Sequence, residues 1–216
     1  MTPSPHQPRL DSAFAQLPLV AILRGLRPEE AAPVAEALFE AGFRLIEVPL
    51  NSPEPFNSIA TIRRLLPRDA LVGAGTVLRS EDVGRLADLG AELVVMPHAD
   101  AAVIRAAAAA GMLCTPGVAT PTEAFAALDA GAAALKIFPA EMAGPPVIKA
   151  MLAVLPRGTR LLPVGGITPD TMAPFRAAGA AGFGLGSALY KPGMTADDVA
   201  GQARRFTAAW AALQAG

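Results

Sequence analysis

Short apolar runs alternate with alanine-rich stretches along almost the whole chain of 216 residues. The apolar runs predict strands at Leu19–Arg24, Leu45–Val48, Leu71–Ala74, Leu93–Met96, Leu113–Thr115, Ala134–Phe138, Arg160–Val164 and Gly182–Gly186. The stretches between and after them predict helices near 28–41, 54–66, 80–89, 100–110, 121–130, 144–155, 169–178 and 195–213. Alternating strands and helices favour a parallel sheet, and eight such units favour a closed (β/α)8 barrel. We therefore expect an α/β fold of the TIM-barrel type.

The whole chain, 1–216, is expected to form a single barrel domain, preceded by a loose N-terminal tail at 1–8 that contains three prolines. A further helix at 9–17 precedes the first strand and is expected to close the bottom of the barrel, where the strands begin.

Glycines and prolines at the helix ends repeat with one spacing in the two halves of the chain. Three pairs lie 89 residues apart: Gly42 and Gly131, Pro67 and Pro156, Gly90 and Gly179. Glycine after the last helical residue is typical of a left-handed cap. Gly111 has no counterpart, so the repeat is approximate, and similar loops without common ancestry would also explain it.

Two ionisable residues that interrupt apolar strands follow the same spacing. Lys136 lies in Ala-Ala-Leu-Lys-Ile-Phe-Pro, and Glu47, 89 residues before it, lies in Arg-Leu-Ile-Glu-Val-Pro. In an eight-stranded barrel these two strands face each other, and residues of equal register belong to one interior layer. Burial lowers the pKa of a lysine, and a neutral lysine is a nucleophile that forms Schiff bases with carbonyl compounds. The alternatives are a strand-end lysine that extends to solvent, and a buried ion pair.

Composition excludes several classes of function. The net charge of −1 gives no support to binding of nucleic acid or a membrane surface, and no apolar stretch is long enough to span a membrane. The single cysteine, Cys114, cannot form an intramolecular disulfide, which fits a reducing, cytoplasmic compartment. Its apolar neighbours favour a buried small side chain over a nucleophile. Two histidines, His6 and His98, cannot supply a zinc site alone, so no metal is expected.

Glycine-rich segments follow three of the predicted strands, at the end of the barrel where active sites lie. They are Gly73–Thr76, Pro163–Thr168 and Gly184–Ser187. Paired glycine loops after the seventh and eighth strands are a common phosphate site in this fold. Arg24 ends the first strand and would bind a carboxylate or phosphate, unless it is an ordinary strand-end arginine. Thr76 would donate a hydrogen bond to a ligand, unless it is a helix cap or turn residue.

Taken together, these segments resemble the class I KDPG/KHG aldolase family, which cleaves 2-keto-3-deoxy-6-phospho-sugar acids. The resemblance covers about residues 18–212 and rests on Ala21–Arg24, Ile46–Val48, Gly73–Thr76, Leu135–Pro139, Val164–Gly166 and Gly184–Ser187. It implies a homotrimeric barrel enzyme, without metal or cofactor, that acts on a small phosphorylated keto sugar acid. It implies Lys136 as the Schiff-base lysine and Glu47 as the general acid and base. It also implies ligand contacts from Arg24, Thr76, Gly166, Gly186 and Ser187.

Two departures from the gluconate-type sequence pattern resemble galactonate-type members of the family. Pro49-Leu50-Asn51-Ser52 stands where the gluconate type has Thr-Leu-Arg-Thr, and Val164 stands where it has threonine. Asn51 and Val164 are therefore the candidate specificity residues. The implied reaction converts 2-dehydro-3-deoxy-6-phospho-D-galactonate to pyruvate and D-glyceraldehyde 3-phosphate.

Three alternatives remain open from the sequence. The gluconate epimer is one candidate substrate of the same reaction. A phosphate-binding barrel isomerase or epimerase would need acid and base groups but no imine. A non-catalytic sugar-phosphate-binding protein would release no pyruvate, and the presence of both Glu47 and Lys136 argues against it.

Overall fold

The computed structural model describes residues 4–215, in which helices and parallel strands alternate. The strands are β1 (Leu19–Ile22), β2 (Leu45–Pro49), β3 (Leu71–Gly75), β4 (Leu93–Val95), β5 (Leu113–Thr115), β6 (Gly117–Val118), β7 (Leu135–Ile137), β8 (Leu161–Pro163) and β9 (Phe183–Leu185). The helices are α1 (Gln7–Gln16), α2 (Pro28–Glu40), α3 (Pro55–Leu65), α4 (Ser80–Asp88), α5 (Ala101–Ala109), α6 (Pro121–Ala130), α7 (Ala140–Val154), α8 (Met172–Ala177) and α9 (Ala196–Ala215), with a 3-10 turn, η1 (Pro169–Thr171). The predicted alternation is confirmed.

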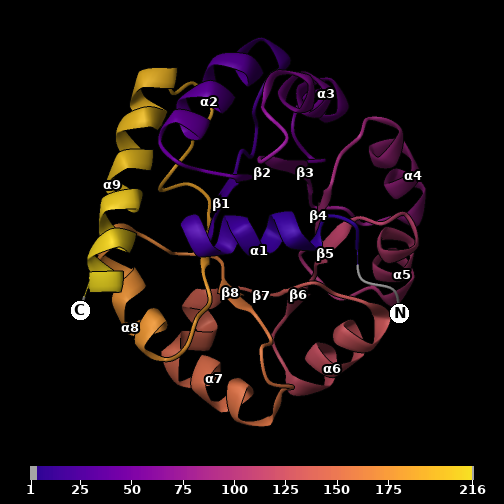
Figure 1. Ribbon diagram of the computed structural model, residues 1–216, viewed down its shortest axis with the longest axis vertical. Coiled ribbons are helices and arrows are strands. Elements are labelled where there is room, and N and C mark those ends of the chain that lie inside the picture. Colours follow the sequence, from indigo (N-terminus) through magenta and orange to yellow (C-terminus); the bar gives the residue numbers. More distant parts are fainter. Residues whose placement is uncertain (1–3, 216) are drawn as a thin grey trace.

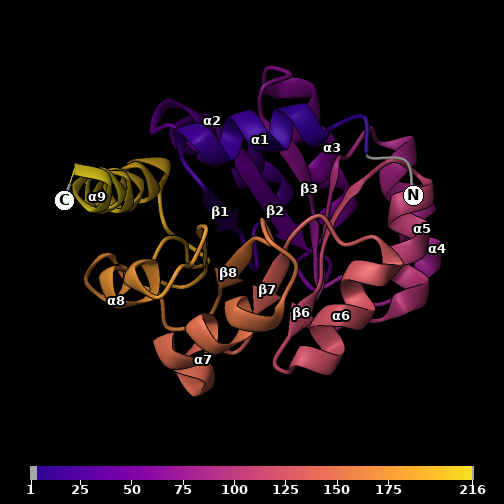
Figure 2. The same ribbon diagram turned by 60° about the horizontal axis from the view of Figure 1, so that its bottom comes forward.

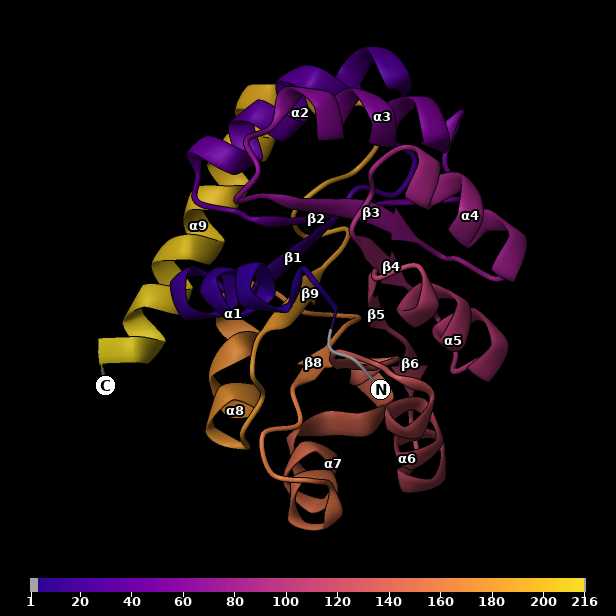
Figure 3. The same ribbon diagram turned by 45° about the vertical axis from the view of Figure 1, so that its right-hand side comes forward.

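The strands form two parallel sheets that meet along both of their edges. One sheet has the order β5-β4-β3-β2-β1-β9 and the other β6-β7-β8. At one junction only Pro116 separates β5 from β6, and its carbonyl oxygen accepts a hydrogen bond from the Lys136 N–H at 2.9 Å. At the other, Val164 and Gly184 form a parallel bridge. The outer helices lie around the strands, as Figures 1 and 3 show.

Glycine caps set the turns from helix to strand, as the sequence predicts. Gly42 and Gly131, one of the pairs 89 residues apart, both have positive φ, 99° and 108°. At the start of α6, Thr120 and Glu123 form a capping box, in which each side chain accepts a hydrogen bond from the other residue's N–H.

Helix α1 covers one end of the strands, as expected of the helix predicted at 9–17. Its buried Leu10 and Ala13 pack against the first residues of four neighbouring strands, namely Leu45, Leu71, Leu93 and Leu113. In Figures 1 and 2 this helix lies across the strands. The expected loose tail at 1–8 is wrong for residues 4–8, because α1 begins at Gln7 and the Ser4 hydroxyl donates to the Gly111 carbonyl. Residues 1–3 lie outside the described residues.

Other boundaries differ slightly from prediction. The first strand ends at Ile22, so Arg24 belongs to the following loop. Helix α7 begins at Ala140 rather than 144, and its helical conformation is interrupted at Gly144 before continuing from Pro145. None of the described helices is long and apolar enough to cross a membrane.

A buried ionic cluster lies near α1. Glu92 accepts hydrogen bonds from the Arg63 guanidinium (3.0 Å) and the Val72 N–H (3.1 Å), and it pairs with Arg9 of α1 at 2.9 Å. Arg63 also donates to the carbonyl oxygens of Ala70, Leu66 and Pro67. Both charged partners therefore have hydrogen bonds in place of water.

We expect Glu92→Ala to lower the free energy of unfolding by about 3–5 kcal/mol, because it leaves the Arg63 charge buried without its partner. Urea unfolding followed by circular dichroism measures this change. The matched control is Arg79→Ala, which removes the exposed pair of Arg79 with Glu81 and should cost less than about 1 kcal/mol. A similar, small cost for both variants would contradict the prediction.

Candidate active site

Lys136 is the middle residue of β7, and its side chain is buried. The residue is 6% exposed, and its Nζ lies 4.6 Å from the centroid of the Phe138 ring. Burial lowers the pKa of Lys136 and the charge of Arg24 adds to this, whereas the charge of Glu47 acts in the opposite direction. The protonated amine is therefore less favoured than in water, as a nucleophilic lysine requires.

Glu47 is the middle residue of β2 and is 1% exposed. Its Oε2 atom is buried and accepts no hydrogen bond from the described residues. Burial raises the pKa of Glu47 from 4.5 to about 7, against the opposing effects of the Lys136 and Arg24 charges. A carboxyl group that titrates near neutral pH can both take and return a proton.

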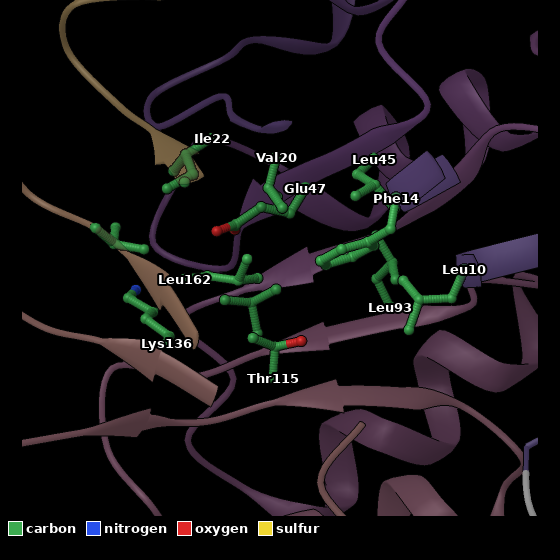
Figure 4. A pocket seen from close by; sticks show the side chains of 13 residues that line it. Leu10, Phe14, Val20, Ile22, Leu45, Glu47, Leu93, Thr115, Lys136 and Leu162 are labelled. Atoms are coloured by element: carbon green, nitrogen blue, oxygen red, sulfur yellow. The ribbon is translucent and has the colours of Figure 1, made fainter. Parts of the chain in front are cut away.

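The two side chains line one narrow pocket between the strands. Figure 4 shows Glu47 and Lys136 reaching into it from different strands, with Phe14 and Leu10 of α1 at its other end. The pocket has a volume of about 20 Å³, room for about one water molecule. Among residues 4–215, the ion pairs that form do not include Glu47 with Lys136. The buried ion pair considered from the sequence is therefore absent from this geometry.

A second, larger pocket of about 240 Å³ lies at the carboxyl ends of the strands. Lys136 lines both pockets, so its amine can meet a ligand that enters the larger one. The other predicted residues around this pocket come from three loops, and they are Arg24, Val164, Gly166, Gly186 and Ser187. Residues predicted to bind a phosphate therefore gather within one pocket with the lysine.

Arg24 and Asn51 are brought together by a hydrogen bond between two neighbouring loops. Arg24 Nη1 donates to Asn51 Oδ1 at 2.9 Å. Beside this contact, the Gly25 N–H donates to the Oγ of buried Ser52, also at 2.9 Å. Asn51 does not line either pocket itself, so the structure links it to the site through Arg24.

Thr76 lines neither the narrow pocket nor the larger one. It follows β3 in a left-handed conformation, with φ of 53°, and is half-buried. The Thr76 ligand contact stays a prediction.

Two residues that sequence reasoning missed also line the larger pocket, Phe138 and Glu141. Phe138 lies two residues after Lys136, and strand alternation, which points such residues to one face, could have identified it. Glu141 lies in the first turn of α7 with its carboxylate against Gly165 and Gly166. The sequence feature that could have identified Glu141 is an acidic residue shortly after the strand that carries Lys136.

Cys114 is buried in the core, and burial raises the pKa of its thiol to about 12. The thiol stays protonated at neutral pH, which agrees with a packing role. In the part of the chain that the structure describes, no group of three or more histidine, cysteine or acidic side chains is arranged to bind a metal ion.

Comparison with known proteins identifies relatives that share most of the chain. A 2-dehydro-3-deoxy-6-phosphogalactonate aldolase of Escherichia coli is 49% identical over 195 residues, which are 90% of this chain and 95% of the relative. A Rhizobium meliloti protein described as "Probable 2-dehydro-3-deoxy-6-phosphogalactonate aldolase" is 53% identical over 199 residues, 92% of this chain and 94% of the relative. A solved structure described as native KDPGal superposes with a TM-score of 0.91 and 48% identity, covering 93% of this chain and 97% of that one.

The family described as KDPG and KHG aldolase matches residues 10–203. That range includes the lysine, the glutamate and all three loops of the larger pocket. With this match and these relatives, the chain belongs to the KDPG and KHG aldolase family.

Proposed function

We propose that this protein is a class I aldolase, a carbon–carbon lyase, that cleaves 2-dehydro-3-deoxy-6-phospho-D-galactonate to pyruvate and D-glyceraldehyde 3-phosphate. The observation that carries the proposal is the pair of buried residues, Lys136 and Glu47, which line one pocket without forming an ion pair. An amine whose pKa is lowered by burial suits imine chemistry, and a carboxyl group with a pKa of about 7 suits proton transfer.

The reaction begins with imine formation. Neutral Lys136 attacks the C2 ketone of the substrate and forms a carbinolamine, which loses water to give a protonated imine. Glu47 transfers the protons of this dehydration, directly or through a water molecule. The positively charged imine then withdraws electrons from C3.

Cleavage follows from that withdrawal. Glu47 takes the proton of the C4 hydroxyl, the C3–C4 bond breaks, and its electron pair forms the enamine of pyruvate on Lys136. C4 becomes the aldehyde carbon of glyceraldehyde 3-phosphate, which leaves. The enamine takes a proton at C3, and water hydrolyses the resulting imine to release pyruvate and regenerate the amine.

Substrate placement follows from the larger pocket. The phosphate is proposed to bind at Gly165-Gly166 and Gly186-Ser187, where glycine lets the backbone approach it. Arg24, held by Asn51, supplies a positive charge for the carboxylate or phosphate. Thr76, beyond β3, is proposed to donate a hydrogen bond to the substrate carboxylate or a hydroxyl.

Preference for the galactonate epimer is proposed to depend on Val164 and Asn51. Val164 lines both pockets beside Lys136 and has no hydroxyl to bond the other C4 epimer. Asn51 is uncharged and accepts a hydrogen bond from Arg24. An arginine at position 51 would be longer and positively charged, and it would remove that hydrogen bond. The names of the two relatives with 49% and 53% identity support the same choice.

For the whole molecule, we propose a single, closed (β/α)8 barrel domain that assembles as a homotrimer in the cytoplasm. Closure is supported by the strand contacts at both junctions of the two sheets. Symmetric assembly is supported by the 49% identity to a chain in a protein cage described as built from symmetric oligomeric domains. The single cysteine, Cys114, supports a reducing compartment.

Pyruvate and borohydride together are expected to leave a reduced covalent adduct on Lys136, which intact-mass spectrometry and peptide mapping can detect. Lys136→Met should abolish the adduct, whereas the matched control Lys149→Met should retain it, because Lys149 lies outside both pockets. An adduct that persists in Lys136→Met would show that another amine is the nucleophile. If the unaltered protein gives no adduct, the isomerase or epimerase alternative is favoured.

The Glu47 carboxyl is expected to titrate at a pH of about 7 in the free protein, and carbon-13 NMR of the labelled carboxyl can follow this. Because the positive charge of Lys136 lowers the pKa of Glu47, Lys136→Met should raise the midpoint further. A midpoint at or below 4.5 in the unaltered protein would remove Glu47 as a neutral-pH acid and base.

Val164→Thr is expected to raise the ratio of kcat/KM for the gluconate epimer over the galactonate epimer by roughly tenfold, since one hydrogen bond contributes about 1–3 kcal/mol. Pyruvate release coupled to lactate dehydrogenase measures both rates. Val95→Thr is the matched control, because Val95 lines the narrow pocket but not the larger one. An unchanged ratio in Val164→Thr would place epimer selection elsewhere.

A further inference from the structure

We infer that Gly75 is a positioning residue. Because it has no side chain, the carboxylate of Glu47, a residue of β2, can pack against the backbone of β3 and stay away from Lys136. This inference rests on the proposed function of the two buried residues. It explains why a buried acid and a buried base share a pocket without becoming an ion pair.

The Glu47 carboxylate occupies the space where a side chain on Gly75 would lie. A Cβ atom added to Gly75 would overlap Oε2 and would lie 2.7 Å from Oε1, and its three nearest atoms would all belong to Glu47. In the strand register Glu47 pairs with Gly73, and Pro49 pairs with Gly75. The Glu47 side chain therefore leans along β3 toward the carboxyl ends of the strands.

Backbone conformation does not explain the glycine at this position. Gly75 is a strand residue and is not among the glycines with positive φ, so an alanine could adopt its backbone conformation. Glycine is needed at Gly73, on the same strand, for another reason, because an added Cβ there would overlap the backbone of Leu93. Of these two glycines of β3, Gly75 is the one whose missing side chain leaves room for a carboxylate.

A carboxylate held on β3 leaves Lys136 free to lose its proton. If Glu47 instead paired with Lys136, each charge would stabilise the other, and the amine would stay protonated and non-nucleophilic. Besides each other, the charged groups near the pair are Arg24, from the loop after β1, which acts on both, and Glu141, at the start of α7, which lines the larger pocket with Lys136. Of these residues, Glu47 is the one whose approach would favour the protonated amine most directly.

A methyl group at position 75 should push the carboxylate off β3 and into the pocket that Lys136 lines. The pKa of Lys136 should then rise and that of Glu47 should fall. Misplacement of the carboxylate should also slow proton transfer, since an error of about 1 Å in a reacting group can cost about 10²-fold in rate.

Gly75→Ala tests this on the intact protein by pyruvate release from the phosphorylated substrate and by the pH dependence of borohydride trapping with pyruvate. We expect kcat to fall about 10²-fold, and the trapping midpoint to move to higher pH. The matched control is Gly84→Ala, an exposed helix position where an added Cβ meets no atom within 4 Å, and it should change neither value. Wild-type kcat and an unshifted midpoint in Gly75→Ala would overturn the inference.

A stability measurement keeps the inference testable even if Gly75→Ala folds poorly. The loss of stability caused by Gly75→Ala, measured by urea midpoints, should largely disappear when Glu47 is also replaced by alanine, because the excluding carboxylate is gone. An equal loss in both backgrounds would show that something other than Glu47 requires the glycine. This comparison needs no activity, so it separates failure of the inference from failure of the proposed aldolase reaction, which would appear as no pyruvate adduct on the unaltered protein.

Discussion

Removal of Lys136 and Glu47 from water is the interaction on which the rest of this site depends. Burial acts against the charged form of each residue, and it moves the two pKa values toward one another. Neither shift would survive if the strands opened to solvent. The contacts between the strands, the leucines at the strand starts and the covering helix α1 therefore contribute to the proposed chemistry as well as to stability.

Among residues 4–215, two buried glutamates lie near buried basic side chains, and they differ in how their charges are paired. Glu92 accepts hydrogen bonds from Arg63 and from a backbone N–H, so its charge is fully engaged. Within the described part of the chain, Glu47 has a buried oxygen without a hydrogen-bond partner and makes no ion pair with Lys136. A buried polar atom left without a partner costs free energy, but the Arg63 Nε atom of the Glu92 cluster is also without one. It is therefore the place of Glu47 in a pocket that Lys136 also lines that favours a role with a ligand.

Sequence reasoning predicted the elements and the burial of Lys136 and Glu47 because both depend on local signals. Alternating apolar runs and glycine caps define the order of strands and helices, and a charged residue inside an apolar strand is visible without coordinates. The Arg24–Asn51 hydrogen bond was not predictable, because it depends on how two loops meet in space. The tail was misjudged for a similar reason, since Ser4 is held by a carbonyl more than a hundred residues away, at Gly111. Glu141 escaped notice because its position against Gly165 and Gly166 arises only when α7 packs beside the loop after β8.

Glycines at the carboxyl ends of the strands have more than one physical cause. From the sequence, Gly165 and Gly166 were expected to be glycines because a phosphate approaches their backbone. In the structure, an added Cβ at either position would also overlap or crowd the side chain of Glu141. At Gly75 the three atoms nearest to an added Cβ all belong to the Glu47 carboxylate. In both places a carboxylate packs against glycine backbone. Glu141 does so at the larger pocket, and Glu47, which lines the narrow pocket, does so at Gly75. A glycine motif in such a loop therefore indicates that some group approaches the backbone closely, and only the geometry tells whether that group is a ligand or one of the protein's own acids.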